Sequence, residues 1–417
     1  MPELKKLSVF GLGKLGSCMA ATFAQKGFEV LGVDINPEPV RRINAGESPV
    51  EEPLLDQVMK EARPRLRATT DPAEAVHTDA SFFIVPSPSL PDGSFSNEFL
   101  MRAMESVARA VRASGKKGHL FVCSSTTTPG AGDSVLIPML EKELNGKCGV
   151  DFSYCYNPEF IALGNVIKGL LEPDMVLIGE SDPVSGAALE MLYRSYNSNK
   201  PNLARMSVAS AELTKISVNS YITMKISFTN QLRLIAAQFP KADIHAILAA
   251  IGSDSRINSK YLRAGLSYGG PCFPRDNRLL AYTARQAGVE APLAVASDAM
   301  NEKTKESLLD EVSDIAKPGS SIAVLGMSYK PDTYITEESA GLFLAQQLKR
   351  RGYQVWTHDY CARPANSPSL FEFNIIEDLA AFFAQNKIDV AVICCPWPQY
   401  NSVKFPVSTR VIAPWKL

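Results

Sequence analysis

The chain has 417 residues, which is too long for one ordinary domain and suits two or three, because single cores rarely exceed roughly 250–300 residues. Hydrophobic residues make up 46% and charged residues 21% of the sequence, and these proportions are typical of globular proteins. The 43 basic and 44 acidic residues nearly cancel, so the net charge favours neither nucleic acid nor an anionic membrane as a partner.

The N-terminal segment has the pattern of a strand, a glycine-rich turn, a helix and a second strand. Leu7–Phe10 is a short apolar run, residues 11–16 read GLGKLG, Ser17–Lys26 predicts a helix, and Phe28–Val33 predicts a strand ending at Asp34. The chain enters the first strand without a basic segment followed by a long apolar one, and no stretch approaches about 18 uninterrupted apolar residues. We therefore expect no signal peptide, no membrane span and a cytoplasmic location.

The glycine-rich turn predicts a dinucleotide site. Gly11 permits a tight turn, Gly13 lets the backbone approach a pyrophosphate, and Gly16 allows the helix to pack closely on the strand. Asp34 stands where a carboxylate accepts from the 2′-hydroxyl of the adenine ribose, which favours NAD over NADP. The arginines at 41–42 argue the other way, although solvated helix residues also explain them. A glycine-rich turn without a ligand is the alternative.

Further apolar runs predict strands that alternate with helical or turn-rich stretches, as in a parallel sheet covered on both faces. Ligands bind at the carboxyl ends of such strands, and two polar motifs follow them: residues 124–130 read SSTTTPG and residues 157–160 read NPEF. These side chains can contact a sugar or a cofactor, although simple capping explains them as well. The strands are predicted at Ala80–Val85, His119–Cys123, Phe152–Tyr156 and Met175–Ile178.

A long apolar-periodic stretch without glycine or proline, Val208–Phe239, predicts a helix that connects domains and offers a surface for subunit packing. Lys215 and Asn219 are four residues apart and share one face of this helix. A cation and an amide donor on one face can hold an oxyanion. The same spacing also fits two solvated side chains.

The eight cysteines and four histidines do not form a metal or disulfide pattern. There is no C-x-x-C motif, and the close pair Cys394–Cys395 suits neither zinc nor an unstrained disulfide, so we expect reduced thiols and no metal site. Cys272 differs from the other seven, because residues 268–276 read YGGPCFPRD and place it on a constrained turn before a helical run, Asn277–Gln286. A helix N-terminus and a nearby cation raise the thiolate fraction that a nucleophile needs. A buried structural cysteine is the alternative for Cys272 and our interpretation of the others.

A turn at Lys317–Gly319 opens a second α/β unit near the C-terminus. The sequence therefore predicts an α/β fold with two Rossmann-like, doubly wound domains joined by a central long-helix dimerisation region. We expect domains at 1–200, 201–300, which carries Cys272, and 301–417. In the last domain, strands are predicted at Ser321–Leu325, Tyr353–Thr357 and Asp389–Cys394, and a helix at Glu338–Arg351.

Taken together and in order, these segments resemble the nucleotide-sugar dehydrogenases, the family that contains UDP-glucose and GDP-mannose 6-dehydrogenases. The resemblance covers essentially the whole chain. The motifs that carry it are GLGKLG, INAGESPVEEPLL, VPSP, SSTTTPG, NPEF, AELTKISVNSYITMKISF, GGPCFPRD and VLGMSYKPDT.

The resemblance implies that one active site oxidises a sugar CH₂OH to a carboxylate with two NAD⁺, through a thiohemiacetal and a thioester on Cys272. It implies that Lys215 and Asn219 stabilise the oxyanions and that Asp276 and Thr126 position or activate water. Arg256 matches an arginine that reaches a neighbouring subunit's site, so a homodimer or larger assembly is implied. The resemblance places the cofactor at Gly11, Gly13, Leu15, Gly16, Asp34, Ser87, Thr126 and Arg275. It places the nucleotide sugar at Glu159, Phe160, Lys215, Asn219, Arg256, Tyr261, Arg263 and Gly269.

Four positions depart from the family pattern. Leu163 stands where the family usually carries a second glutamate, assigned as a base or acid, and loss of a general base typically costs about 10²–10⁴ in rate. Glu337 replaces an arginine near the cofactor, Pro39 replaces a basic residue, and Arg275 replaces a lysine after the nucleophile. These departures put the hydrolysis of the thioester in doubt.

Three hypotheses follow. The first is a nucleotide-sugar 6-dehydrogenase in which Asp276, Thr126 and water suffice for hydrolysis. The second is a divergent enzyme that stops at an aldehyde or passes the thioester to another acceptor, and the third is a paralogue that binds NAD or nucleotide sugar without turnover. Arg263 and the SSTTTPG spacing lean toward GDP-mannose, whereas UDP-glucose is our first choice because it is the commoner substrate in the family.

Overall fold

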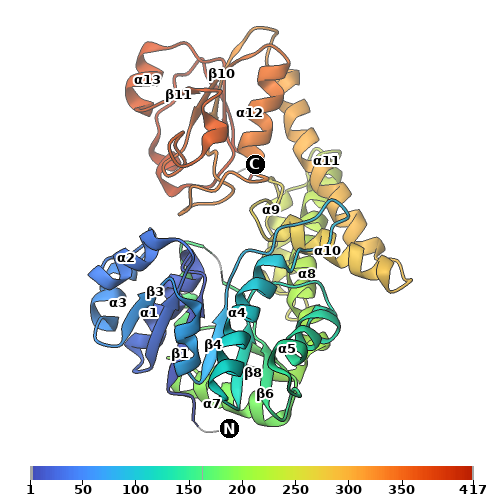
Figure 1. Ribbon diagram of the computed structural model, residues 1–417. Helices are drawn as coiled ribbons and strands as arrows, with labels where there is room; N and C mark the ends of the chain where they lie inside the picture. The colour runs from blue at the N-terminus through green and yellow to red at the C-terminus, as the bar shows by residue number, and fades with distance from the viewer. Residues whose placement is uncertain (1–2, 162, 416–417) are drawn as a thin grey trace. The chain divides into compact units, whose positions relative to one another are not determined.

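The computed structural model describes residues 3–161 and 163–415, and its internal contacts divide the chain into two compact units, Met1–Lys215 and Ile216–Leu417. The division falls inside one long helix, α8 (Val208–Ala236). Figure 1 shows the sheet of each unit with its helices. We describe each unit by itself.

Unit 1 is built on an eight-stranded sheet, counted over the described residues, with the order β3-β2-β1-β4-β5-β6-β7-β8. Neighbouring strands run parallel except β6 and β7, which pair antiparallel at Cys155–Glu180 and Tyr156–Gly179. The parallel sheet that the sequence predicts is therefore found except at this one pair, because β7, a helix and β8 form a separate βαβ unit that runs in the opposite direction. The strands are β1 (Lys6–Phe10), β2 (Glu29–Val33), β3 (Leu66–Thr69), β4 (Ala80–Phe83), β5 (His119–Cys123), β6 (Phe152–Tyr156), β7 (Met175–Glu180) and β8 (Asn202–Ser207).

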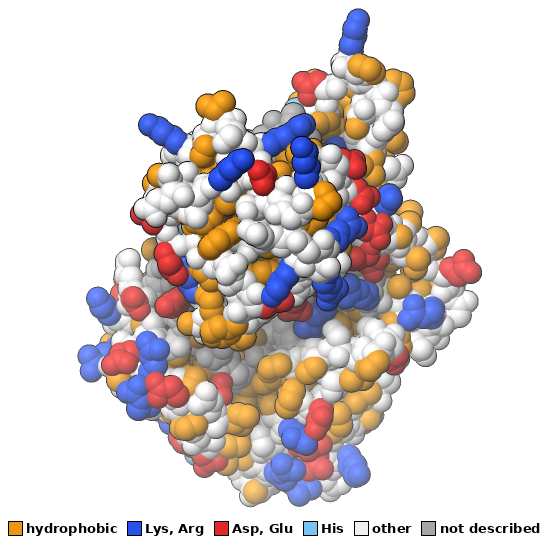
Figure 2. Space-filling model, turned by 90° about the horizontal axis from the view of Figure 1, so that it is seen from above, with side chains coloured by type: hydrophobic (Ala, Val, Ile, Leu, Met, Phe, Trp, Pro, Cys, Tyr) orange, Lys and Arg blue, Asp and Glu red, His pale blue; other side chains and the backbone are white. Residues whose placement is uncertain are grey.

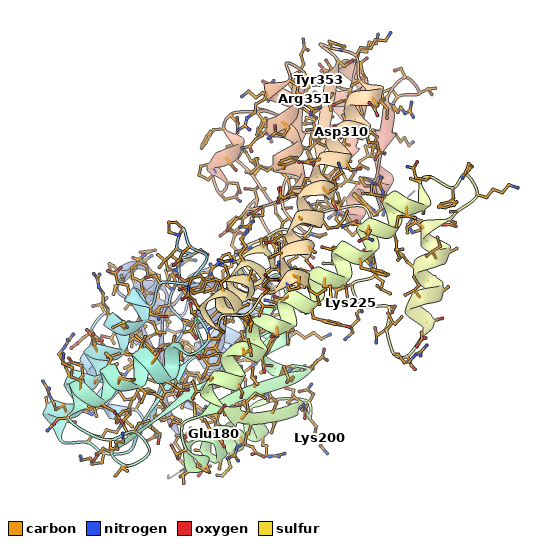
Figure 3. The ribbon with its side chains drawn as sticks, turned by 90° about the vertical axis from the view of Figure 1, so that its right-hand side faces the viewer. Glu180, Lys200, Lys225, Asp310, Arg351 and Tyr353 are labelled. Atoms are coloured by element: carbon orange, nitrogen blue, oxygen red, sulfur yellow. The ribbon has the colours of Figure 1, made fainter. Side chains whose placement is uncertain are left out.

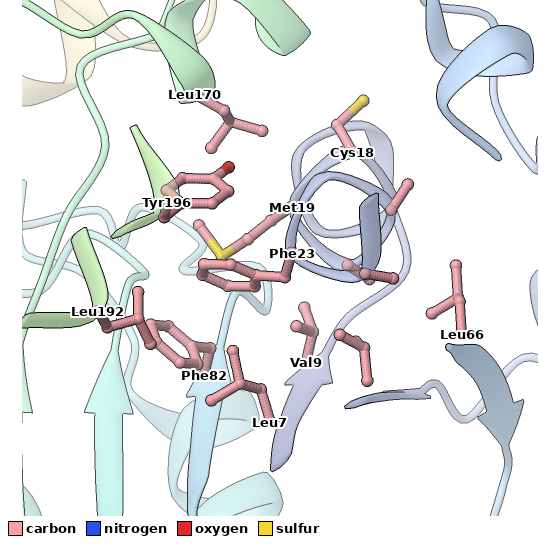
Figure 4. Close-up of a cluster of buried hydrophobic side chains, with 14 of the residues drawn as sticks. Leu7, Val9, Cys18, Met19, Phe23, Leu66, Phe82, Leu170, Leu192 and Tyr196 are labelled. Atoms are coloured by element: carbon pink, nitrogen blue, oxygen red, sulfur yellow. The ribbon is translucent and has the colours of Figure 1, made fainter. Parts of the chain in front are cut away.

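Helices cover both faces of this sheet, each over its own apolar cluster. One cluster, shown in Figure 4, joins Val9 of β1 and Phe82 of β4 to Phe23 of one helix and Tyr196 of another. The other cluster lies under α4, α5 and the start of α8. The doubly wound fold that the sequence predicts is confirmed here. The helices are α1 (Lys14–Gln25), α2 (Pro37–Ala45), α3 (Leu55–Ala62), α4 (Glu98–Ser114), α5 (Ile137–Leu144), α6 (Val166–Leu171) and α7 (Pro183–Tyr196).

Unit 2 combines a helical region with a second, all-parallel sheet of order β11-β10-β9-β12-β13. Apolar clusters lie on both faces of this sheet, so it is the Rossmann-like element that the sequence predicts near the C-terminus. In Figure 3, Lys225 marks α8 and Asp310 marks α11. The elements are α9 (Ile244–Ser253), α10 (Phe273–Gln286), α11 (Pro292–Ile315), β9 (Ser321–Leu325), α12 (Ala340–Arg350), β10 (Gln354–His358), β11 (Asn374–Ile375), α13 (Leu379–Gln385), β12 (Val390–Ile393) and β13 (Arg410–Ile412).

Two helix starts differ from their predicted positions. Helix α10 begins at Phe273, directly after Cys272, and not at Asn277, because Pro274 suits the first turn of a helix. Helix α12 begins at Ala340, because Glu338 has a positive φ of 53° and Ser339 caps the helix by accepting from the Leu342 N–H.

The surface carries charges of both signs. Figure 2 shows Lys and Arg side chains interspersed with Asp and Glu side chains on the face turned to the viewer, in keeping with the net charge of −1. Within residues 3–161 and 163–415, no helix has the length and apolar character needed to cross a membrane.

Candidate active site

The glycine turn between β1 and α1 fits a dinucleotide. Gly11 has φ +90°, and a Cβ there would lie 2.3 Å from the Ile84 carbonyl oxygen, whereas a Cβ on Gly16 would lie 1.8 Å from the Gly11 carbonyl oxygen. These two glycines are required by packing. A Cβ on Gly13 would meet nothing within 4 Å, and Gly13, the N-cap of α1, offers no side-chain cap to the first N–H groups of the helix. An open helix N-terminus is suited to a pyrophosphate.

Asp34 lies at the end of β2, where its carboxylate accepts from the N–H of Leu12 at 2.6 Å and of Asn36 at 2.8 Å. Each oxygen retains a lone pair for a ribose hydroxyl. The neighbouring arginine, Arg41, is engaged by Glu38, with Nη2 2.7 Å from Oε1. The pairing disfavours Arg41 as a ligand for a 2′-phosphate, and with Asp34 it supports NAD over NADP.

The loop after β5, which carries Thr126, is held by a buried carboxylate. Glu212 of α8 accepts from Thr127 Oγ1 at 2.9 Å, from the Gly132 N–H at 2.9 Å and from the Gly130 N–H at 2.6 Å. Burial raises the pKa of Glu212, and the three donors act against that rise. The role of Glu212 was not predictable from the sequence, because nothing in its spacing distinguishes it from the other acidic residues of helices.

The other predicted cofactor residues are half-buried. Leu15 packs on the first apolar cluster of unit 1, and Ser87 and Thr126 follow β4 and β5. Arg275 lies in the first turn of α10 in unit 2.

Glu159, Phe160 and Lys215 come together in unit 1. Lys215 Nζ donates to the Glu159 carbonyl oxygen at 2.7 Å and lies 4.8 Å from the centroid of the Phe160 ring. The Lys215 side chain is almost fully buried, with 8% of the residue exposed. Burial raises the pKa of the Glu159 carboxyl to about 7, although Lys215 lowers it. A carboxyl with such a pKa can take up and release a proton near neutral pH.

Leu163 is half-buried and packs on the first apolar cluster of unit 1. The loop around it is fixed by Glu52, whose carboxylate accepts from the N–H groups of Gly164 at 3.3 Å and Val166 at 2.9 Å. The position at which the family pattern places a glutamate thus holds an apolar side chain in apolar surroundings.

Asn219 contacts the first turn of α10, which follows Cys272 in unit 2. Asn219 Nδ2 donates to Asp276 Oδ2 at 2.6 Å, and the Asp276 N–H donates to the Cys272 carbonyl oxygen at 2.9 Å. Asp276 is 3% exposed, whereas Cys272 is exposed at the N-cap position of α10. A thiol at a helix N-terminus with access to solvent is well placed to act as a nucleophile.

The remaining cysteines contrast with Cys272. Five are buried and two are half-buried, and burial raises the pKa of Cys18 and of Cys155 to about 12. In the part of the chain that the structure describes, no group of His, Cys, Asp and Glu side chains could hold a metal ion.

The other predicted substrate residues lie near the turn or on the surface of unit 2. The Tyr261 ring packs edge-on against Phe273 at 6.2 Å between centroids. Arg256 has a side chain that is 86% exposed and is paired with Asp254 at 2.6 Å. Arg263 is exposed, and Gly269 is buried.

Comparisons with known proteins agree with this arrangement. Models of the UDP-glucose/GDP-mannose dehydrogenase family match the chain with the NAD binding domain over residues 5–197, the central domain over 209–303 and the UDP binding domain over 323–415. The chain is 33% identical to a UDP-glucose 6-dehydrogenase of Haloferax volcanii over 402 residues, which cover 95% of this chain and 93% of that protein. It is also 33% identical to a GDP-mannose 6-dehydrogenase of Pseudomonas putida over 359 residues, 85% of this chain and 80% of that protein.

A solved structure gives the same result. The UDP-glucose dehydrogenase of Pyrobaculum islandicum superposes with a TM-score of 0.90 at 31% identity, covering 99% of this chain and 98% of that one. The chain therefore belongs to the UDP-glucose/GDP-mannose dehydrogenase family, the NAD-dependent nucleotide-sugar dehydrogenases.

Proposed function

We propose that the protein oxidises the C6 alcohol of a UDP-hexose, UDP-glucose as first choice, to the carboxylate through Cys272. The single observation that carries this proposal is the exposed Cys272 at the N-terminus of α10, one helical turn before Asp276, whose carboxylate accepts from Asn219. Bound NAD⁺ supplies the hydride acceptor for each oxidation. The alcohol would be oxidised to the aldehyde first, and the thiohemiacetal on Cys272 would then be oxidised to the thioester.

The Cys272 thiol takes part in two steps, addition to the aldehyde and release from the thioester. The Cys272 sulfur adds to the aldehyde carbon and its proton passes to the carbonyl oxygen, which gives a thiohemiacetal. After the second hydride leaves, water attacks the thioester, the C–S bond breaks, and the acid and the thiol are released. In sum, the alcohol, two NAD⁺ and one water give the carboxylate, two NADH and three protons.

Lys215 and Asn219, one turn apart on α8, are the proposed donors to the oxygen that becomes negative when sulfur or water adds to the carbon. Asp276 and Thr126 are the proposed partners of the attacking water. Glu159, whose pKa of about 7 suits proton transfer at neutral pH, is the proposed proton acceptor where Leu163 offers none.

Leu163 also supports a second candidate function, an enzyme that stops at the aldehyde or passes the thioester to an acceptor other than water. A paralogue that binds without turnover is the third possibility, and it would have no use for an exposed cysteine at the N-terminus of α10. The relatives at 33% identity include both a UDP-glucose and a GDP-mannose 6-dehydrogenase, so the assay must cover both substrates.

The test is a panel of UDP-glucose, GDP-mannose and UDP-N-acetylhexosamines, each incubated with NAD⁺ and assayed for NADH and for the uronic acid. The proposal expects NADH and acid with UDP-glucose. Intact mass of the protein separates the second candidate, which predicts a persistent acyl adduct on Cys272. Absence of NADH with every sugar would favour the non-catalytic reading.

We also propose that the chain has three functional domains, which divide near residues 200 and 300, and that its small-molecule partner is a nucleotide sugar. We propose further that the protein works as a homodimer or larger assembly. The exposed Arg256 and the exposed aromatic residues of α8, Tyr221 and Phe228, support the subunit contact. Sedimentation of the purified protein tests it.

A further inference from the structure

The turn that carries Cys272 is covered by a segment of the C-terminal Rossmann-like region, Tyr329–Glu338, here called the covering segment. The Gly270 N–H donates to the Glu337 carbonyl oxygen at 2.9 Å. A Cβ on Gly269 would lie 2.4 Å from the Glu338 carbonyl oxygen, and a Cβ on Gly270 would lie 2.6 Å from the ring of Tyr329. The two glycines are therefore required because the covering segment packs directly on them.

The covering segment is anchored at its end by Glu338. Its carboxylate accepts from Arg278 Nη2 of α10 at 2.9 Å and from Lys305 Nζ of α11 at 3.1 Å. Glu338 adopts the left-handed region with φ 53°, a backbone conformation that side-chain-bearing residues rarely take. The surrounding contacts must therefore hold it in place.

This network differs from an exposed ion pair. The Lys305 side chain is only 5% exposed and also pairs with Glu302 at 2.8 Å. Burial raises the pKa of Glu338, but Arg278 and Lys305 together lower it below its ordinary value, so the carboxylate is ionised at neutral pH. Partly buried ion pairs that join three elements are screened less than surface pairs.

The other side of the turn is bonded by different residues of α11. Tyr268 donates its hydroxyl to Asp298 Oδ1 at 2.7 Å, and its backbone N–H and C=O bond the side-chain amide of Asn301 at 2.8 and 3.0 Å. The N-terminal side of the turn thus keeps its anchor when Glu338 is changed. Arg278 also lies 3.9 Å from Asp298, and we expect the loss of Glu338 to act mainly on the covering segment and the glycines beneath it.

We propose that Glu338 is a positioning residue that, through Arg278 and Lys305, holds the covering segment on the nucleophile turn and thereby keeps Cys272 in its reactive position. Its effect on turnover rests on the proposed function, whereas its effect on the turn does not.

Hydrogen–deuterium exchange of a peptide that contains the Gly270 amide tests the structural part. In Glu338→Gln, this amide should exchange about tenfold faster, as expected for loss of a charge-assisted hydrogen-bond network. Glu302→Gln is the matched control, because it removes the other carboxylate from Lys305 without touching the covering segment, and its exchange should equal that of the unaltered protein. Arg278→Gln, at a half-exposed position, should reproduce the increase and serves if Glu338→Gln does not fold.

The catalytic part is tested by steady-state kinetics of the same variants. Glu338→Gln should lower kcat about tenfold, and the matched control Glu302→Gln should leave kcat unchanged. Unchanged exchange in both Glu338→Gln and Arg278→Gln would overturn the proposal, and so would an equal increase in Glu302→Gln. If the unaltered protein formed no NADH with any nucleotide sugar, the proposed function would fail while the exchange result would still decide the role of Glu338.

Discussion

At the scale of single residues, the chemistry depends on where burial changes the behaviour of a side chain. Cys272 is exposed at a helix N-terminus, whereas burial raises the pKa of Cys18 and of Cys155 to about 12. The same eight thiols are thus separated by environment into one nucleophile candidate and seven small apolar residues.

Leu163 permits a direct test of the glutamate that the family usually carries at this position. Leu163→Glu should raise the rate of acid formation, by up to about 10²-fold if a general base is restored. It should also lower the free energy of unfolding by about 1–3 kcal/mol, because Leu163 packs on an apolar cluster. Leu163→Gln is the matched control, with the same loss of stability and no base. Equal rates of acid formation in the two variants would contradict our interpretation of this position.

Glu159 predicts a pH dependence of stability. Its pKa is raised from 4.5 to about 7 in the folded protein, so between these pH values the folded state binds a proton that the unfolded state has lost. The free energy of unfolding should therefore fall as pH rises from 4.5 to 7, by about 2 kcal/mol, less than the full shift implies because the side chain keeps some exposure.

The measurement compares thermal midpoints of Glu159→Gln and the unaltered protein at pH 5 and pH 8. The variant should be the more stable of the two at pH 8 and equal at pH 5. A difference that is the same at both pH values would exclude Glu159 as its source.

At the scale of elements, the turn between β1 and α1 contains glycines that packing requires and one glycine, Gly13, that packing does not require. A Cβ on Gly13 meets nothing within 4 Å, whereas a Cβ on Gly16 would lie 1.8 Å from the Gly11 carbonyl oxygen. Gly13→Ala should therefore keep the thermal midpoint and bind NAD⁺ at least about tenfold more weakly, because the methyl group occupies the path of the pyrophosphate.

Gly16→Ala is the contrasting variant and should lose about 1–3 kcal/mol of stability through overpacking. Thermal unfolding and fluorescence titration with NAD⁺ measure both quantities. Normal NAD⁺ affinity in Gly13→Ala would contradict the placement of the cofactor at this turn.

Local elements were the part of the fold that could be predicted from sequence. The β1-turn-α1-β2 unit, Asp34 and the long helix α8 follow from patterns within some thirty residues of one another, and the structure has them. The antiparallel entry of β7 was not predictable, because strand direction depends on pairing between distant segments.

The candidate site likewise contains a residue that could be predicted from the sequence and others that could not. Cys272 stands out by its glycines and the helix that follows, whereas the supporting carboxylates act over long separations. Glu212 bonds residues 80 to 85 positions away, and Glu338 bonds a residue 60 positions away. Glu338 was also predicted inside a helix, because a glutamate in a sequence gives no indication that its φ is positive.

At the scale of the whole molecule, two Rossmann-like sheets and a helical region account for 417 residues, and family models cover all three parts in order. The near-zero net charge leaves recognition of a nucleotide sugar to local cations, and the ones we propose are Lys215, which is buried, and Arg263, which is exposed.

The most direct test of the central claim is the yield of NADH per molecule of nucleotide sugar consumed, measured to completion with limiting UDP-glucose and excess NAD⁺. Two oxidations at one carbon through Cys272 predict two NADH per sugar and the uronic acid as product. A yield of one NADH per sugar, with the aldehyde as product, would contradict the account.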